Sequence, residues 1–245
     1  MALPNIDILN GITGLEIILS GYILGFILIF KHARKAPNKK VKKNIILSGI
    51  GLITLFQAWF GVSASFLLMV LGFPPLGYPA GDPNIGVLAY AWGPAIGVPI
   101  WAYITSNLFK KGRYKIPITG IFVVLSIIFA VMIYTFPSIS TSWNPSEGGG
   151  LPETGIRGIA LYTLGIMLII MMVLLGPIAI ISGLKLEDKS AKWKRFMYGA
   201  GIIMGSLFGL IDAGVSGLPL IGLAIVKAGI FTSIFLIYEG IDKGR

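Results

Sequence analysis

Residues 196–240 read FMYGAGIIMGSLFGLIDAGVSGLPLIGLAIVKAGIFTSIFLIYEG, and this stretch decides the fold. It holds two apolar runs of membrane length, joined by the tight turn Ser216-Gly217-Leu218-Pro219. Lys227 lies in the middle of the second run, where inserting a lysine into a membrane costs about 2.5–3.5 kcal/mol. We therefore expect another group of the protein to offset the cost of this charge.

The composition is that of a membrane protein with several spans. Of the 245 residues, 55% are hydrophobic and only 12% are charged, whereas a soluble domain usually has about 25% charged residues. The chain has no cysteine and a single histidine, His32. This excludes disulfides, thiolate metal sites, histidine-rich metal sites and haem with two histidine ligands. We expect no metal and no cofactor.

Apolar runs predict an all-α bundle of seven transmembrane helices in a single domain that covers residues 1–245. The expected spans are residues 8–30, 44–71, 85–109, 116–136, 159–184, 196–216 and 218–240. A polar loop is expected between the fourth and fifth spans, over residues 137–158.

Basic residues are distributed on one side of the predicted spans. The stretches after spans one, three, five and seven hold seven, four, five and two of the 20 Lys and Arg residues, and the other two are Arg157 and Lys227. Positive charge marks the cytoplasmic side, so we expect an amino terminus outside and a carboxyl terminus in the cytoplasm of a multi-pass protein of the cell membrane. Gly148 should then face outside, and Lys39 should face the cytoplasm.

The densest basic stretch follows the first span. It is interpreted as a topology determinant that also contacts anionic lipid headgroups, with docking of a cytoplasmic protein as the alternative. The net charge of +10 would suggest nucleic acid in a soluble protein, but the position of these charges beside the bilayer predicts no nucleic-acid partner. The residues expected to contact headgroups are Lys39, Lys40, Lys42 and Lys43.

Glycines at helix-packing spacing lie in the sixth span. Gly201, Gly205 and Gly209 form two overlapping small-xxx-small steps, which allow close approach of helix backbones. We expect packing within the bundle, with homodimerisation as the alternative. Gly240, at the expected membrane edge, should tolerate a larger side chain. The fifth span, rich in methionine and poor in polar residues, is interpreted as a lipid-facing helix.

Polar residues inside other spans are candidate partners for Lys227. Counted from the outer turn at about 1.5 Å per residue, Asp212 lies about 7 Å deep and Lys227 about 15 Å deep. We expect Lys227 to pair with Asp212 first and with Glu16 second; Gln57 is a further buried polar group. Such a pair is either a structural clasp or part of a site for a ligand or ion.

Aromatic residues beside two prolines form a second candidate site in the third span. Pro94 and Pro99 should kink the helix. Trp92, Trp101 and Tyr103 lie next to them. Kinked helices with aromatic side chains line ligand pockets in many receptors and transporters, but they also occur in ordinary packing.

Two motifs that carry chemistry in other membrane proteins are not supported. Gly214-Val215-Ser216-Gly217 spells the G-x-S-G of rhomboid proteases, but His32 is expected at the opposite face and cannot serve as its base. We expect no enzymatic activity. A lysine in the seventh span also suggests retinal, yet the third span has no acid, and Leu223 stands one turn before Lys227. A retinal-binding photoreceptor is therefore only a minor alternative.

The last two spans carry a resemblance to known proteins. The run GSLFGLID at residues 205–212, followed by GLPLIG at residues 217–222, is similar to the end of the seven-span sensor region at the amino terminus of some histidine kinases. The chain also resembles stand-alone seven-span archaeal proteins of unassigned function, in Val226-Lys227-Ala228-Gly229-Ile230 and in Tyr238-Glu239-Gly240. This resemblance implies a sensing role. Because no kinase domain follows, we expect a separate membrane or cytoplasmic partner to receive the output.

Three functions compete on this basis. The leading hypothesis is a receptor-like or sensor-like module, or an accessory membrane subunit, that acts through a separate partner. The second is a small-solute transporter, because carriers of the three-plus-one-plus-three type share this size and orientation. Those carriers have an internal repeat with a Pro-Gln pair in each half. This chain has no Pro-Gln pair and no convincing match between spans one to three and five to seven. A purely structural subunit is the third.

Overall fold

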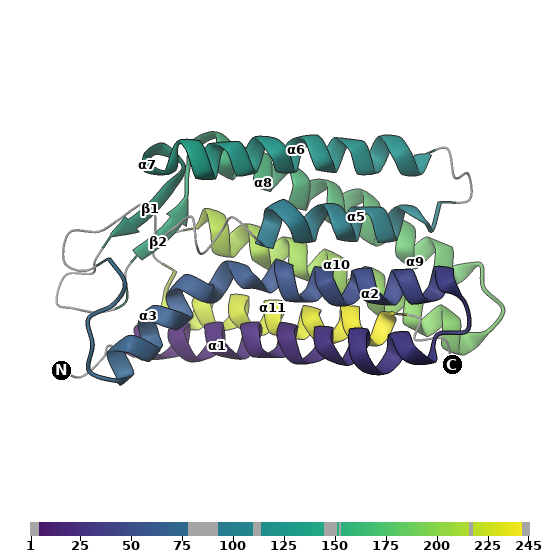
Figure 1. Cartoon of the computed structure of the whole chain (residues 1–245), viewed down its shortest axis with the longest axis horizontal. Coiled ribbons are helices and arrows are strands. Elements are labelled where there is room, and N and C mark those ends of the chain that lie inside the picture. The colour runs from purple at the N-terminus through teal and green to yellow at the C-terminus, as the bar shows by residue number, and fades with distance from the viewer. Residues whose placement is uncertain are drawn as a thin grey trace.

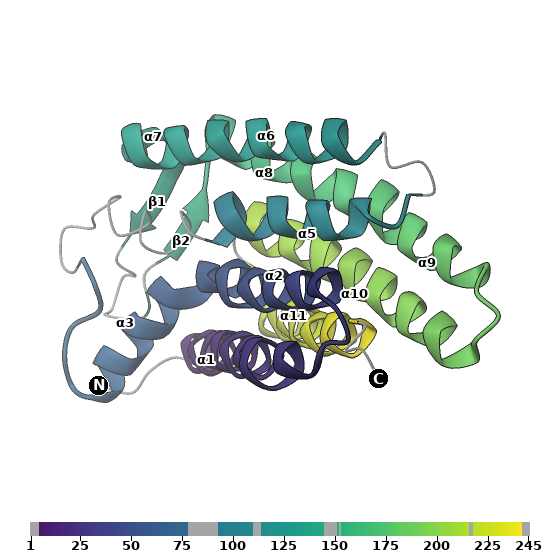
Figure 2. The same ribbon diagram turned by 45° about the vertical axis from the view of Figure 1, so that its right-hand side comes forward.

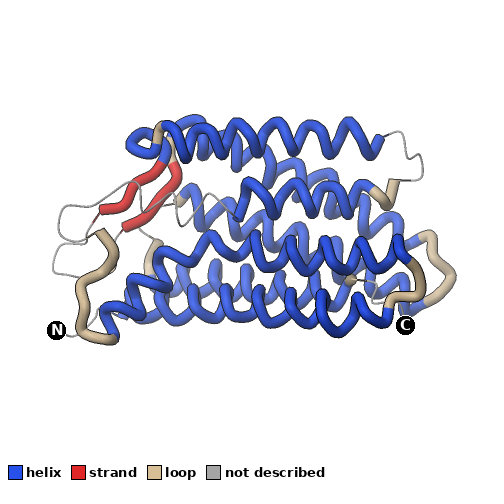
Figure 3. Tube along the Cα trace, viewed as in Figure 1, coloured by secondary structure: helices blue, strands red, loops and turns tan. Residues whose placement is uncertain are grey.

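The helices lie side by side in a bundle, with their axes roughly parallel (Figure 1). The computed structural model describes residues 5–77, 93–109, 114–144, 151, 153–215 and 218–241. Within these residues the only strands form one short hairpin at one end of the bundle (Figure 3). Six helical stretches are long and apolar enough to cross a membrane, which confirms the predicted all-α, multi-pass architecture.

The six membrane-length stretches agree with six of the predicted spans. Two of them, which start at Lys39 and Lys189, begin five and seven residues earlier than expected, because a polar side chain caps each helix start. Asn38 accepts a hydrogen bond from the Val41 N–H at 2.9 Å, and Asp188 accepts from the N–H groups of Ser190 and Ala191. The basic residues that follow therefore lie in the first turns of helices and not in loops. The stretches are Asn5–Lys35, Lys39–Val70, Lys115–Thr135, Gly158–Leu184, Lys189–Gly214 and Leu220–Gly240.

The third predicted span is described from Gly93 onward. It consists of the π-helical turn η4 (Gly93–Gly97) and helix α5 (Val98–Ser106), which runs beside the longer helices (Figure 1). Pro99 is the second residue of α5 and follows η4 without a break in the helical backbone, so its missing N–H accompanies the irregular π-helical turn. The start of this span, with Trp92, lies outside the described residues, as do Gly148 and the turn residue Ser216.

Three of the long stretches are interrupted by irregular turns. The first is α1 (Asn5–Phe26), continued by η1 (Ile27–His32) and η2 (Ala33–Lys35). The fourth, which is the fifth predicted span, is α8 (Gly158–Ile170), η6 (Met171–Leu175) and α9 (Gly176–Leu184). The second is α2 (Lys39–Leu55), the 3₁₀ turn η3 (Phe56–Trp59) and α3 (Phe60–Val70), and the ribbon bends between α2 and α3 (Figure 1).

The predicted polar loop over residues 137–158 contains regular structure. After α6 (Lys115–Thr135) come the short helix α7 (Pro137–Ser140) and strands β1 (Thr141–Asn144) and β2 (Glu153–Ile156). The strands pair antiparallel, with Thr141 opposite Ile156. The Asp7 carboxylate accepts a hydrogen bond from the Leu151 N–H at 2.9 Å, so this segment is fastened to the start of α1.

The helices follow one another around the bundle in chain order. Helix α1 packs on α2, α3 and α11; α5 packs on α2 and α6; and α6 packs on α8. Helix α8 packs on α10 (Lys189–Gly214), which packs along α11 (Leu220–Gly240), and α11 returns to α1. Figure 2 shows α1 and α6 at opposite borders of this arrangement.

The interpretation of the fifth span as a lipid-facing helix holds for only one of its faces, where Tyr162, Ile166 and Val173 are exposed. Met167 is fully buried and Met171 is 4% exposed, because this span packs between α6 and α10. Helix α6 is the more peripheral one, since many of its large apolar side chains are exposed, among them Val124 and Ile127. A helix that is apolar all round gives no sequence signal for which face is covered.

The glycines of the sixth span differ in how closely they are packed. A Cβ added at Gly201 would lie 2.8 Å from Ile237 Cγ1, and one added at Gly205 would lie 3.0 Å from Ser233 Oγ. Both glycines therefore face α11 closely, as predicted. Gly209 is different, because its added Cβ would make an ordinary contact of 3.9 Å with Leu168 on α8.

The expectation that Gly240 tolerates a larger side chain is wrong. Gly240 is buried, and an added Cβ would lie 2.5 Å from Tyr198 Cα on α10. Real Cβ atoms do not approach backbone this closely. The end of α11 therefore crosses the start of α10 at this glycine.

Helices α1 and α2 cross at a reciprocal glycine–isoleucine contact. A Cβ added at Gly25 would lie 2.6 Å from Ile53 Cγ1 and 2.8 Å from the Gly49 carbonyl oxygen. One added at Gly49 would lie 2.6 Å from Ile29 Cγ1 and 2.7 Å from the Gly25 carbonyl oxygen. Each glycine thus receives the isoleucine that stands four residues after the opposite glycine.

Helices α9 and α10 cross in the same way. A Cβ added at Gly176 would lie 2.5 Å from Ile203 Cγ1, and one added at Gly199 would lie 2.6 Å from Ile180 Cγ1. These residues follow their counterparts in the first crossing by 150 or 151 positions. The sequence search for a repeat missed this correspondence because few residues carry it.

The two crossings belong to two groups of three helices: α1, α2 and α5 before α6, and α9, α10 and α11 after it. In each group the third helix also packs on a glycine of the second helix. A Cβ added at Gly51 would lie 2.9 Å from Trp101 Nε1 on α5, and one added at Gly201, 150 positions later, would meet Ile237 on α11. In each group the second helix lies between the other two. The groups before and after α6 therefore share one packing pattern.

Candidate functional site

Lys227 and Asp212 form an ion pair inside the bundle. The Lys227 ammonium lies 2.8 Å from Asp212 Oδ1, and the side chains are 4% and 18% exposed. The two residues come from neighbouring helices, α11 and α10. The pairing that the sequence predicted is confirmed, and it neutralises a charge that is strongly unfavourable in hydrocarbon.

Trp59 completes this cluster and was not predicted. Its indole Nε1–H donates a hydrogen bond to Asp212 Oδ2 at 3.0 Å. The Lys227 ammonium lies 5.6 Å from the centroid of its ring, within the range of cation–π attraction. One carboxylate oxygen of Asp212 thus pairs with Lys227 of α11, and the other accepts a hydrogen bond from Trp59 of η3. We call Lys227, Asp212 and Trp59 the charged cluster.

The turn η3 makes a second polar contact. The Tyr22 hydroxyl of α1 hydrogen-bonds Gln57 Oε1, so Gln57 is engaged by α1 while Trp59 is engaged by α10. A 3₁₀ turn inside a longer helix often marks a hinge. The sequence Phe56-Gln57-Ala58-Trp59 has no Gly or Pro, so only the polar residues in an apolar run could have indicated this place.

Glu16 does not belong to the charged cluster. It is exposed on the outer face of α1, while the Lys227 ammonium is paired with Asp212. The sequence prediction that Glu16 is buried is therefore wrong. Helical periodicity decides the outcome, because the neighbouring buried positions Gly14, Ile17 and Ile18 turn the opposite face inward.

The predicted aromatic site of the third span is not assembled around one cavity. Trp101 is 1% exposed, and its ring centroid lies 5.9 Å from that of Tyr198. The Tyr198 hydroxyl is 2.9 Å from that of Thr105. Tyr103 lies elsewhere, with the Lys115 ammonium 4.0 Å from its ring centroid. Within the described part of the chain, neither Trp101 nor Tyr103 contacts the charged cluster.

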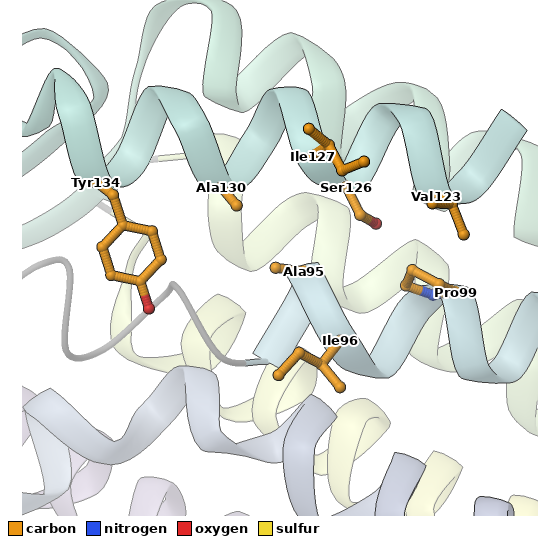
Figure 4. A pocket seen from close by; sticks show the side chains of 8 residues that line it. All are labelled: Ala95, Ile96, Pro99, Val123, Ser126, Ile127, Ala130 and Tyr134. Atoms are coloured by element: carbon orange, nitrogen blue, oxygen red, sulfur yellow. The ribbon is translucent and has the colours of Figure 1, made fainter. Parts of the chain in front are cut away.

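An apolar groove lies beside the third span instead. It has a volume of about 440 Å³, and side chains of α6 point across it toward η4 and α5 (Figure 4). Pro99 contributes to it, whereas Trp101 and Tyr103 do not. The lining residues are Ala95, Ile96, Pro99, Val123, Ser126, Ile127, Ala130 and Tyr134.

The basic residues at the start of α2 are all exposed. The Lys43 ammonium lies 5.4 Å from the centroid of the Tyr103 ring, so Lys43 also contacts the protein. Contact of these side chains with anionic headgroups remains a prediction. The residues are Lys39, Lys40, Lys42 and Lys43.

No protein-family model matches the chain, and no curated protein is significantly similar to it. Among the described residues, no group of three His, Asp or Glu side chains is placed to hold a metal ion. The cluster offers one cation, one carboxylate shared between two donors, and an aromatic ring.

Proposed function

We propose that this chain is a receptor-like or sensor-like module of seven transmembrane helices, or an accessory membrane subunit, that acts through a separate partner. The observation that carries the proposal is the charged cluster at the hinge η3. The ring of helices in chain order and the charge asymmetry of the sequence support seven spans with the carboxyl terminus in the cytoplasm.

The charged cluster has the properties of a two-state element. Asp212 binds both Lys227 and Trp59, so a ligand that replaces its carboxylate weakens both contacts together. Trp59 is the last residue of η3, and α3 follows directly. Loss of the Trp59 contact therefore frees α3 to pivot relative to α10. A signal that biases these two arrangements reaches the ends of the helices, where a partner reads it.

The test is a distance measurement between spin labels at the outer ends of α3 and α10. Val70 and Val215 are both exposed, and the absence of cysteine lets Val70→Cys/Val215→Cys carry the labels alone. We expect Asp212→Asn to produce a second distance population. Adding Lys227→Met to Asp212→Asn should not restore the original distance, because Trp59 has lost its charged acceptor.

Matched controls distinguish a cluster that changes between two arrangements from one that is a static structural contact. A label pair at Lys40 and Ser190, both exposed at the starts of α2 and α10, should keep its distance in every variant. Thr54→Val removes a hydroxyl that bonds only its own helix, so it should leave both distances unchanged. A single, merely broadened Val70–Val215 distance in Asp212→Asn would mean that the cluster is a static clasp, and the sensor proposal would fail.

A small-solute transporter is the second candidate, because the two groups of three helices share one packing pattern. Parallel repeats of this kind support alternating access in known carriers. Lys227→Met/Asp212→Cys places a thiol at the cluster without leaving an unpaired charge. Modification of this thiol by an impermeant reagent from both sides, in vesicles of opposite orientation, favours a transporter. Modification from one side or from neither favours the sensor.

A further inference from the structure

The outer face of α1 carries one acidic residue among apolar ones. Glu16 is exposed, and no described residue forms an ion pair or a hydrogen bond with its carboxylate. Helix α1 packs on α2, α3 and α11, and it lies at the border of the bundle in both views (Figures 1 and 2). The other exposed residues of this outer stripe are Ile8, Ile12, Leu19, Ile23, Phe26 and Phe30.

Glu16 lies deep in the membrane. At about 1.5 Å per residue it is about 12 Å from Ile8 and about 22 Å from Lys31 along the helix. Its neighbour Gly14 faces Ser63 and Trp59, because a Cβ added there would lie 2.8 Å from Ser63 Oγ and 4.0 Å from Trp59 Cβ. Glu16 is thus at the depth of the charged cluster but points away from it. A carboxylate in hydrocarbon at this depth is strongly unfavourable without a partner.

No Lys or Arg in the described part of the chain is placed to pair with Glu16. Of the chain's 20 Lys and Arg residues, only Lys227 lies in the middle of a span, and its ammonium is buried against Asp212. The other described basic residues lie near the ends of helices. A second copy of the chain therefore brings no basic side chain to the depth of Glu16.

We propose that the outer stripe of α1 is the docking face for a transmembrane helix of another protein that carries Lys or Arg at the depth of Glu16. This inference rests on the proposed function, because it gives the chemistry of the separate partner. Polar pairs between helices supply specificity in a membrane, where apolar surfaces do not distinguish one helix from another. Ile12 and Leu19, one turn to either side of Glu16, provide the apolar contact.

The test uses the full chain in lipid vesicles and a synthetic leucine-rich transmembrane helix with one Lys in its outer third. A helix with Leu at that position is the matched probe. Energy transfer from a dye at Ser190→Cys to the probe measures association. We expect the Lys probe to bind about fivefold to thirtyfold more tightly than the Leu probe. Glu16→Gln should abolish this preference, while Val124→Gln, at an exposed position on α6 away from the stripe, should retain it.

Two results would overturn the inference. One is equal binding of the two probes, or a preference that persists in Glu16→Gln. The other is self-association of the chain that Glu16→Gln abolishes, because a second copy would then occupy the stripe. The probe assay does not report on the charged cluster, and the Val70–Val215 distance does not report on the outer stripe. Failure of one proposal is therefore distinguishable from failure of the other.

Discussion

Removing one member of the Lys227–Asp212 pair should cost more than removing both. Asp212→Asn leaves the ammonium of Lys227 without its counter-charge, and Lys227 is 4% exposed. Lys227→Met leaves a carboxylate that is 18% exposed and still accepts the Trp59 hydrogen bond. In Lys227→Met/Asp212→Asn neither charge remains, and the indole keeps only a neutral amide oxygen as a weaker acceptor.

The burial of the two side chains determines which single variant loses more stability. Breaking a buried ion pair by removing one partner costs about 3–5 kcal/mol. We place Asp212→Asn at the upper end, because Lys227 is the more buried partner, and Lys227→Met at the lower end. Hydrogen bonds between membrane helices average only about 0.6 kcal/mol in double-mutant cycles. A favourable coupling above about 2 kcal/mol therefore indicates a paired charge and not simply a hydrogen bond.

The assay is reversible unfolding in mixed micelles, followed by circular dichroism, for the wild type, both single variants and the double variant. The double variant should be more stable than the sum of the two single losses predicts. Strictly additive losses would refute the reasoning, because they would mean that neither charge depends on the other for its stability. Thr54→Val serves as a control for the loss of a polar group at a neighbouring position.

Three further predictions concern packing, topology and chemistry. Gly240→Ala should destabilise the protein in detergent by about 1–3 kcal/mol through overpacking, whereas Gly214→Ala, which meets open space, should be neutral or stabilising; equal melting temperatures would contradict this. In intact cells an impermeant thiol reagent should label Gly148→Cys and not Lys39→Cys, and the reverse pattern would contradict the orientation. Expression with added retinal should give no visible absorption band, and a band that Lys227→Ala removes would revive the photoreceptor hypothesis.

The sequence by itself determined where the chain can cross a membrane and that Lys227 needs an acidic partner. Span prediction depends on the length of apolar runs, which is a local property of the chain. The choice of Asp212 followed from depth, because within one hairpin a lysine side chain can bridge most of the gap between about 15 Å and about 7 Å. The same reasoning could not place Trp59, since its span is distant in the sequence and its break has no Gly or Pro.

Only the tertiary structure decided which face of each helix is covered. The spans are apolar nearly all round, so periodicity does not indicate an inner face. Glu16 was predicted to be buried and is exposed. The fifth span was interpreted as lipid-facing, yet one face of it is covered and buries Met167. Gly240 was expected to have space and instead touches the backbone of α10. The physical reason is that lipid and protein interior are equally apolar. Close packing and the few polar contacts, and not hydrophobicity, select the arrangement of the helices.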